Sequence, residues 1–322
     1  MTMFSWVVSP PEERNMKPIV TTVLLLSILL GGAKIARADG FVLAGGVFTP
    51  INVPGSTETE VNGINNSGQV VGLFANSTGQ YGFVDSGGDF TTISVPGGGS
   101  TIATGINDGG QVTGVYSLIG GGANGFIEMG GVFTTISVPG SLVTVPYGIN
   151  DSGQIVGAYG NSTGGFSSFL YSGGLFTTIC VPGSSQTYVY GINNSGQLVG
   201  YFVDSTGAFG FIDTDGVFTT ISAPGNSQTY AFGINNSGQV VGSDDDGAFI
   251  YTDGVFSTIN DPFPPEDHLD AFGINDSGQI TVNTAPEPSG LILLPFGLAT
   301  VGIMSLRARR PEQAGPASPR RH

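Results

Sequence analysis

The sequence predicts an all-β fold, a six-bladed β-propeller in which each repeat of about 42 residues supplies four strands. Three observations support this prediction. The phrase GINNSGQVVG recurs in near-copies, the phrase FTTISVPG recurs at the same spacing, and no stretch between residues 39 and 285 has helical periodicity. The copies of the first phrase start 40 to 43 residues apart, at Gly63, Gly105, Gly148, Gly191, Gly233 and Gly273.

Each repeat predicts two β-hairpins. One is formed by segments such as GFVDSG and GDFTTISV, and the other by NGIN and QVVGLF on either side of an Asn-Ser-Gly turn. Val, Ile, Phe, Thr and Tyr fill the expected strands, whereas Gly, Pro, Asn, Asp and Ser fill the turns. In the turn, asparagine oxygens are expected to cap the backbone and Gly68 to adopt positive φ. This turn chemistry accounts for the asparagines without any further role.

The Val–Gly alternation of QVVG indicates a strand packed closely against a neighbouring sheet. If each blade takes the Gly-Ile-Asn hairpin first, five blades are continuous in the sequence. The sixth blade then joins residues 41–53 to residues 272–282, and this pairing removes an exposed sheet edge. A β-solenoid is the alternative, but its turns are usually shorter than 42 residues and it requires capped ends.

Residues 1–38 are expected to be an N-terminal extension and a secretory signal peptide. From Met16, a basic residue and an apolar run precede Ala36 and Ala38, which form the A-x-A pattern of a signal peptidase site. We take Met16 as the start, because Glu12 and Glu13 do not fit a cationic signal region. The repeats then occupy residues 39–284, and a tail follows at 285–322.

The tail combines a Pro-Glu-Pro motif, an apolar helix over residues 291–306 and an arginine cluster. The helix is short for a membrane span, and the arginines would hold its end in the cytoplasm, so we expect transient membrane association. A tail anchor or a buried helix is the alternative. The motif and cluster residues are Pro286, Glu287, Pro288, Arg307, Arg309 and Arg310.

These three parts, in this order, resemble the PEP-CTERM sorting tail, which exosortase enzymes process in Gram-negative bacteria. The resemblance covers about the last 37 residues. It implies cleavage near residues 286–288 and release or transfer to the cell surface or extracellular matrix. Exosortase and signal peptidase would be the processing partners.

The repeat region carries no fixed positive charge. All nine Lys and Arg residues lie outside residues 39–285, where twenty acidic residues give a formal charge of −20. Nucleic acid is therefore excluded as a partner, because phosphate neutralisation needs Lys or Arg. Divalent cations or cationic partners would complement this surface, although the charge could also serve solubility alone.

Reactive side chains are scarce. Cys180 is the single cysteine and excludes an internal disulfide, and His268 is the single histidine of the repeat region. A His/Cys zinc site therefore lacks ligands, and no nucleophile elbow accompanies the histidine. Enzymatic chemistry is left with carboxylates.

The repeated phrases resemble the HAF family of extracellular repeats. In that family a Gly-Ile-Asn-x-x-Gly-x-Ile/Val-Val-Gly segment precedes His-Ala/Gly-Phe and then Phe-x-x-Ile-x-x-Pro-Gly, and the match covers residues 40–283. The resemblance implies an extracellular location and a repeat fold. The family histidine is replaced, so no role of it is carried over; its positions are occupied by Tyr81, Asn124, Ser167, Phe209 and Gly247.

The last repeat departs from the pattern in two acidic segments. Asp244, Asp245 and Asp246 occupy one loop, and the segment NDPFPPEDHLDAFGIN adds acids around His268. Clustered carboxylates could bind Ca²⁺, although no EF-hand-like loop is present. A solvated acidic turn is the alternative.

Two functions follow from these observations. The first is an exported, non-catalytic surface or matrix protein that binds polysaccharide or a partner in an exopolysaccharide or biofilm setting. The second is a secreted glycoside hydrolase or lyase that uses carboxylates of the last repeat. A purely structural role without a ligand is also open.

Overall fold

The computed structural model describes residues 40–160, 165–260, 262–263 and 267–286, all within one compact unit. These residues form 24 strands and no helix, so the prediction of an all-β fold is confirmed. No helix among them is long and apolar enough to cross a membrane. The predicted signal peptide with Ala36 and Ala38, and the predicted sorting helix with its arginines, lie outside the described residues.

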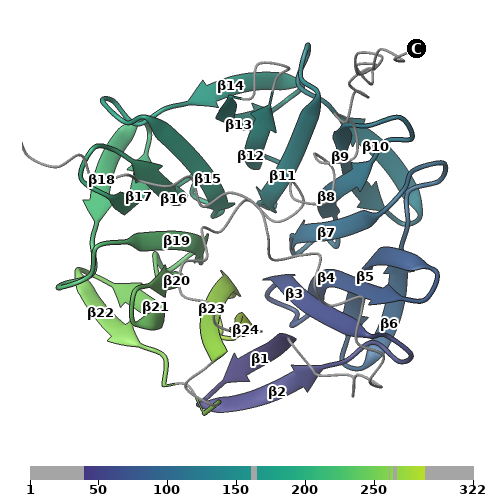
Figure 1. Cartoon of the computed structure of the whole chain (residues 1–322), viewed down its shortest axis with the longest axis horizontal. Coiled ribbons are helices and arrows are strands. Elements are labelled where there is room, and N and C mark those ends of the chain that lie inside the picture. Colours follow the sequence, from purple (N-terminus) through teal and green to yellow (C-terminus); the bar gives the residue numbers. More distant parts are fainter. Residues whose placement is uncertain (1–39, 161–164, 261, 264–266, 287–322) are drawn as a thin grey trace, which may run out of the picture. The chain divides into compact units, whose positions relative to one another are not determined.

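Each repeat forms two hairpins, as predicted, and these combine into a four-stranded antiparallel unit. In the first continuous unit the strand order is β3 (Glu58–Ile64), β4 (Val70–Asn76), β5 (Gly79–Ser86) and β6 (Asp89–Ile93). β3 is the inner strand, closest to the common axis, and β6 is the edge strand (Figure 1).

Four further units have the same inner-to-edge order. They contain β7 (Thr101–Ile106), β8 (Val112–Ser117), β9 (Ala123–Met129) and β10 (Val132–Ile136); β11 (Val143–Ile149), β12 (Ile155–Gly160), β13 (Phe166–Ser172) and β14 (Leu175–Ile179); β15 (Gln186–Ile192), β16 (Leu198–Val203), β17 (Ala208–Thr214) and β18 (Val217–Ile221); and β19 (Thr229–Ile234), β20 (Val240–Asp244), β21 (Gly247–Thr252) and β22 (Val255–Thr258). A single parallel pair, Val143 with Ala123, joins the units β7–β10 and β11–β14 into one eight-stranded sheet.

The remaining sheet combines strands from both ends of the repeat region. Its order is β2 (Val47–Ile51), β1 (Gly40–Ala44), β24 (Ile280–Pro286) and β23 (Asp267–Ile274). β1 pairs with β24 from Gly40 opposite Asn283 to Leu43 opposite Ile280, which is the pairing expected from the sequence. The backbone of Pro286 still belongs to β24, where it lies opposite Asp267.

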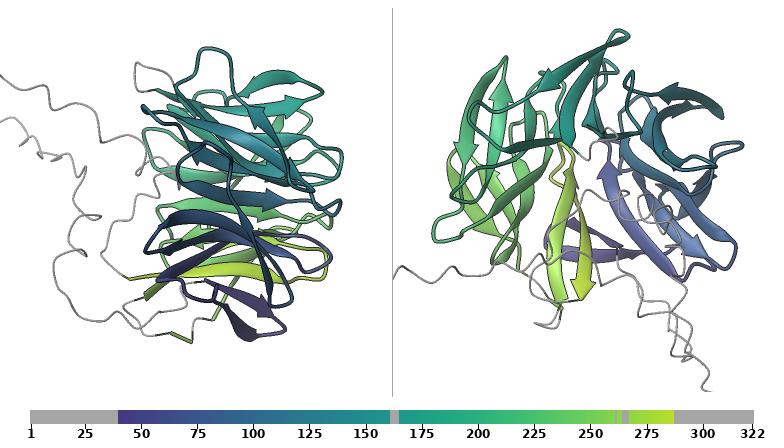
Figure 2. Two further views of the ribbon diagram at one scale, coloured as in Figure 1. Left: turned by 90° about the vertical axis from the view of Figure 1, so that its right-hand side faces the viewer. Right: turned by 45° about the horizontal axis from the view of Figure 1, so that its top comes forward.

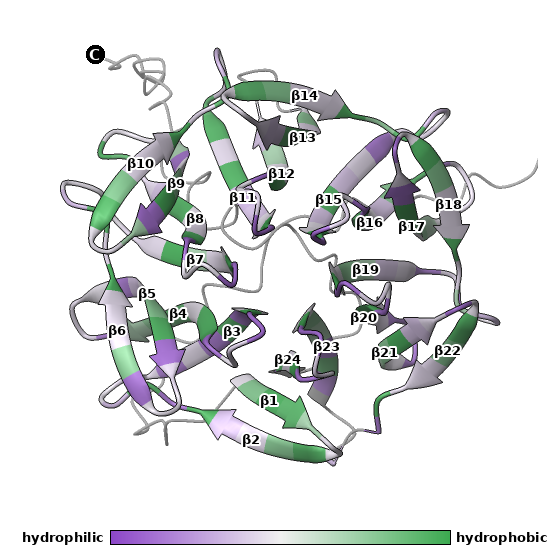
Figure 3. Ribbon diagram, turned by 180° about the vertical axis from the view of Figure 1, so that it is seen from behind, coloured by the Kyte–Doolittle hydropathy of each residue, from purple (hydrophilic) through white to green (hydrophobic). Residues whose placement is uncertain are grey.

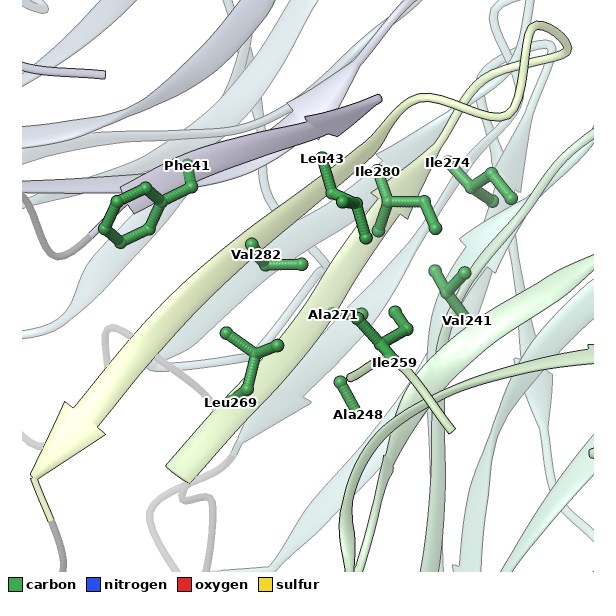
Figure 4. Packing of buried hydrophobic residues seen from close by; sticks show 10 residues of the cluster. All are labelled: Phe41, Leu43, Val241, Ala248, Ile259, Leu269, Ala271, Ile274, Ile280 and Val282. Carbon is green, nitrogen blue, oxygen red and sulfur yellow. The ribbon is translucent and has the colours of Figure 1, made fainter. Parts of the chain in front are cut away.

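The sheets are arranged around the axis, and successive sheets lie face to face (Figures 1 and 2). Hydrophobic residues occur on the strands of every sheet (Figure 3). Their buried side chains form clusters that combine residues of neighbouring sheets. In one such cluster, Val241 and Ala248 of the β19–β22 unit face Leu269 and Ala271 of β23 (Figure 4). Burial of these apolar side chains is the main stabilising contribution available to a fold without fixed cations.

A buried phenylalanine recurs on the third strand of each continuous unit. Phe83, for example, is fully buried and packs edge-on against Phe90 of the edge strand, with ring centroids 5.8 Å apart. Corresponding pairs in the other four units have centroid distances of 5.0 to 5.6 Å. The two rings come from the two strands of one hairpin, so this contact holds the third strand and the edge strand of a unit together.

The second strand approaches the inner strand closely. A Cβ atom at Gly72 would overlap the carbonyl oxygen of Glu60 on β3, beside a register shift between Val61 and Gly63. Equivalent overlaps occur at Gly114, Gly157, Gly200 and Gly242. The close packing expected from the Val–Gly alternation is thus present, and its immediate partner is the backbone of the paired inner strand.

Candidate functional site

The Asn-Asn-Ser-Gly turn has the predicted chemistry. The Asn65 side-chain oxygen accepts hydrogen bonds from the backbone N–H groups of Ser67 and Gln69, at 3.1 and 2.9 Å. The Gly68 N–H donates to the Asn65 carbonyl at 3.0 Å, and Gly68 has φ of 78°. Gly68 therefore provides the left-handed residue that the turn requires.

The same asparagines also join the units, which corrects the expectation that they have no further role. The Asn65 side-chain amide donates to the carbonyl of Asn107 in the next unit at 3.1 Å. Each copy repeats this bond, and Asn275 returns to the carbonyl of Asn65 at 3.0 Å. We call the set the inner asparagine ring; it consists of Asn65, Asn107, Asn150, Asn193, Asn235 and Asn275.

A second closed set of hydrogen bonds uses the following residue of each repeat. The backbone N–H of Asn66 donates to the Asp108 carboxylate at 2.7 Å, and the last bond runs from Asp276 back to the Asn66 side chain at 2.7 Å. Four equivalent bonds complete this outer ring. Its members are Asn66, Asp108, Asp151, Asn194, Asn236 and Asp276.

The two rings line a polar axial pocket of about 70 Å³. Ligand pockets for small molecules are usually about 300–1,000 Å³, so this pocket is too small for a sugar ring. Burial raises the pKa of Asp276, but hydrogen bonds from the Asn236 backbone and from the Asn236 and Asn66 amides outweigh it and lower the pKa. The geometry of the rings therefore suits joining the units more than binding a ligand.

A larger cavity of about 450 Å³ lies between the unit β15–β18 and the unit β19–β22. We call it the inter-unit groove. One aromatic ring, two amides, a hydroxyl and a carboxylate line it together with apolar and backbone atoms. Its lining residues are Gln197, Ile212, Asn236, Ser237, Gly238, Tyr251, Asp253 and Gly254.

The two amide side chains of the inter-unit groove are held in place by hydrogen bonds with members of the rings. Gln197 accepts from the Asn193 amide at 2.8 Å and donates to Thr214 at 3.2 Å. The Asn236 amide donates to Asp276 at 2.8 Å. The rings thus preorganise these amides, which lowers the entropic cost of binding.

Tyr251 lies on β21 and packs against Phe256 of the edge strand, with ring centroids 4.9 Å apart. Asp253 follows in the turn to β22 and has φ of 50°, a left-handed backbone conformation that favours glycine. The edge strand therefore supports the ring, and Tyr251 and Asp253 both line the groove.

Tyr251 and Asp253 both depart from the repeat pattern. The position opposite the edge-strand phenylalanine holds a carboxylate in three units, where it accepts the N–H of the following turn glycine at 2.6 to 2.7 Å. Those carboxylates belong to Asp85, Glu128 and Asp213. Tyr251 replaces this turn contact with an aromatic ring. The sequence signal for Tyr251 is the change from a carboxylate to an aromatic residue at this repeat position, and it lies outside the acidic loops.

The predicted calcium residues lie at the end of β20 and do not form a common site. Asp245 accepts hydrogen bonds from the backbone and hydroxyl of Ser227 at 2.6 and 2.8 Å. Asp244 accepts the backbone N–H of Asp246 at 2.9 Å, and burial is the main cause of its raised pKa. Across the described ranges, no three His, Cys, Asp or Glu side chains are placed to hold a metal. The calcium site therefore stays a prediction without support from the geometry.

The second acidic segment contributes one buried carboxylate. Asp270 is 3% exposed, and its Oδ1 atom lies 3.7 Å from Nε2 of His268. Burial raises the pKa of Asp270, partly offset by a hydrogen bond with Ser243 and by His268. Cys180 is exposed.

Several predicted site residues fall outside the described part of the chain. Glu266 and the remaining residues of the sorting motif, Glu287 and Pro288, are among them. The backbone of Asp267 belongs to β23.

Comparison with known proteins gives similarities in structure only. No protein-family model matches the sequence, and no curated protein matches it. A triple arginine-to-alanine mutant of AofleA from Arthrobotrys oligospora is 13% identical, covering 71% of this chain and 80% of its own, with a TM-score of 0.45. The six-bladed β-propeller lectin of Aleuria aurantia, with a fucose recognition mode, is 14% identical over 71% and 88% of the chains, with a TM-score of 0.43.

A structure described as a gluconolactonase is also similar. It is 13% identical, covers 79% of this chain and 95% of its own, and has a TM-score of 0.40. At these identities and TM-scores, the ligands and activities of the three proteins are not transferred to this chain.

Proposed function

We propose that the chain is a non-catalytic six-bladed β-propeller that binds polysaccharide. The inter-unit groove supports this function, because it places the Tyr251 ring beside two amides and the Asp253 carboxylate. Aromatic rings stack on the apolar faces of sugar rings, while amides and carboxylates bind sugar hydroxyl groups. A volume of about 450 Å³ lies within the usual range for small-ligand sites.

The blade number and the cellular location belong to the same proposal. Six blades are supported by the two hydrogen-bond rings, each of which passes through all six repeats. Export to the surface or matrix of a Gram-negative bacterium, in an exopolysaccharide or biofilm setting, is supported by the sequence segments alone. Signal peptidase at Ala36-x-Ala38 and an exosortase near Pro286 are the proposed processing partners.

The test is retention of the protein on the extracellular polysaccharide of the host. Tyr251→Ala should weaken retention about tenfold, since a stacked aromatic ring contributes on the order of 1 kcal/mol or more. Tyr171→Ala is the matched control, because Tyr171 occupies the same register position and packs against Phe176 at 4.9 Å. If wild-type protein is not retained, or if the two variants lose retention equally, polysaccharide binding at this groove is wrong.

The alternative function, a carbohydrate-active enzyme, is favoured by one observation. Asp270 is a buried carboxylate with a raised pKa, as a general acid requires. The same incubation therefore records newly formed reducing ends. Their release by wild-type protein and its loss in Asp270→Asn would replace the proposed function with hydrolysis. Retention without release supports the non-catalytic function.

A further inference from the structure

We propose that the inter-unit groove binds a sugar that carries a free, protonated amine. This inference rests on the proposed polysaccharide binding and specifies the chemical class of the ligand. It combines the charge of the groove, the backbone conformation of Asp253 and a comparison of the groove with equivalent places in other repeats.

The charge of the groove selects against anionic sugars. Residues 40–286 contain no Lys or Arg, and Asp253 is the charged residue among those that line the groove. A uronate, sulfate or phosphate group would be repelled there and would find no cation to pair with. A protonated amine would instead form a charge-assisted hydrogen bond with the Asp253 carboxylate.

The conformation of Asp253 is unusual within the described residues. Asp215 and Asp253 are the two non-glycine residues with positive φ, at 54° and 50°. The same turn position is glycine in the other units, at Gly45, Gly87, Gly130 and Gly173. A left-handed backbone disfavours a residue with a side chain by about 1–2 kcal/mol, although aspartate tolerates it better than most. The turn therefore carries a carboxylate although the backbone conformation there disfavours a side chain.

The combination of ring and carboxylate distinguishes this groove from its equivalents. Asp215 follows Asp213, which contacts its own turn at 2.7 Å, so that turn has a carboxylate without an adjacent aromatic ring. Tyr171 has the ring, but Gly173 stands at the turn position. Tyr251 and Asp253 together offer an amine both a cation–π contact and a carboxylate.

The remaining groups of the groove suit the hydroxyls of the same sugar. Gln197 and Asn236 each engage one neighbour through their amide N–H groups and retain a second N–H. The Ser237 hydroxyl makes no hydrogen bond within the part of the chain that the structure describes. With the amine bound at Asp253, the Gln197 amide, the Asn236 amide and the Ser237 hydroxyl remain to orient the sugar ring.

The experiment uses the full chain and calorimetric titration with a glucosamine hexamer, at a pH at which its amines are protonated. The N-acetylglucosamine hexamer and cellohexaose are the comparison ligands. We expect the glucosamine hexamer to bind about tenfold more tightly than either, which corresponds to one charge-assisted contact. Asp253→Asn should remove this preference, so that the variant binds the glucosamine hexamer and the acetylated hexamer with equal affinity.

Asp215→Asn is the matched control. Asp215 has the same left-handed backbone conformation as Asp253, and its substitution removes the same charge. If both aspartate variants weaken glucosamine binding equally, the amine is attracted by the acidic surface in general and the proposed site is wrong. Equal affinity for all three hexamers overturns amine selectivity while leaving polysaccharide binding in place. If none of the three hexamers binds, the amine-sugar assignment is overturned, while the retention assay on host polysaccharide separately decides the proposed function.

Discussion

At the scale of single residues, one asparagine side chain performs two tasks. The Asn150 oxygen accepts the Gln154 N–H at 2.9 Å and shapes the turn, while its amide donates to the Asn193 carbonyl of the next unit at 3.1 Å. Both tasks use groups that are buried, since Asn150 is 3% exposed. An unpaired buried polar group costs about 1–3 kcal/mol, so both bonds of the side chain must be kept in the folded state. Each of these residues therefore links local and long-range structure.

Buried and exposed carboxylates predict opposite effects of pH on stability. The pKa of Asp270 is raised from 3.8, mainly by burial. Its contribution to stability is therefore fully present below pH 3.8, the unfolded pKa, and is lost as pH rises through the folded pKa. The pKa of Asp276 is lowered from 3.8, because hydrogen bonds outweigh the effect of burial. Its contribution to stability is therefore fully present above pH 3.8, the unfolded pKa, and is lost as pH falls through the folded pKa.

Urea unfolding of variants between about pH 3 and pH 7 measures these effects. Relative to wild-type protein, Asp270→Asn should become more stable as pH rises, because it removes a carboxylate that is unfavourable when ionised. Asp276→Asn, the control of opposite sign, should become less stable over the same range. A stability difference for Asp270→Asn that does not change with pH would contradict the assignment.

At the scale of strands, the close approach of the second and inner strands makes a sharp prediction. A Cβ atom at Gly200 would overlap the Tyr188 carbonyl oxygen, and backbone cannot move aside as a flexible side chain can. Gly200→Ala should therefore lower the free energy of unfolding by about 3 kcal/mol. Gly165→Ala is the control, because a Cβ there would contact nothing within 4 Å. Equal urea midpoints for the two variants would show that the sheet relaxes around the methyl group.

The strands were predictable from sequence because their causes are local. Alternating apolar residues and the turn at Asn65–Gly68 followed from the repeated phrases. The pairing of β1 with β24 is not local, and it followed from the repeat frame, which leaves one blade to be shared by the two ends. The bonds of the asparagine rings were not predictable in this way, because five amides meet a carbonyl 40 to 43 residues away, and Asn275 meets one 210 residues away, only after two units are placed. The groove was missed for the same reason, since Gln197 and Tyr251 belong to different units.

At the scale of the whole described domain, Asn283 adds a buried pair of hydrogen bonds between the sheet β2-β1-β24-β23 and the first continuous unit, beside the ring bonds of Asn275 and Asp276. Asn283 on β24 accepts the Val61 N–H at 3.0 Å and donates to the Val61 carbonyl at 2.8 Å. The equivalent register position in the first unit is Leu73, which lies opposite Glu60 as Asn283 lies opposite Asp270. An amide thus replaces an apolar contact at the junction between the last repeat and the first.

Replacement of this amide predicts a loss of global stability. Asn283→Leu has a volume that the equivalent position accepts, but it leaves the buried N–H and C=O groups of Val61 without these partners. We expect a decrease of about 2–4 kcal/mol in the free energy of unfolding, measured by urea titration. Unchanged stability would mean that water or a shifted strand satisfies Val61.

The pairing of β1 with β24 has a consequence for how the chain acquires its structure. The two strands are separated by more than 230 residues, so this contact has the largest sequence separation in the fold. During synthesis, β1 and β2 are made before β24, so their hairpin lacks its third strand until β24 is made. Contacts of such separation slow folding, and an isolated two-stranded hairpin is marginally stable in water. Completion of the fold is therefore timed by the last segment of the repeat region to emerge, and a chain interrupted before residue 280 would expose the edge of β1 to other molecules.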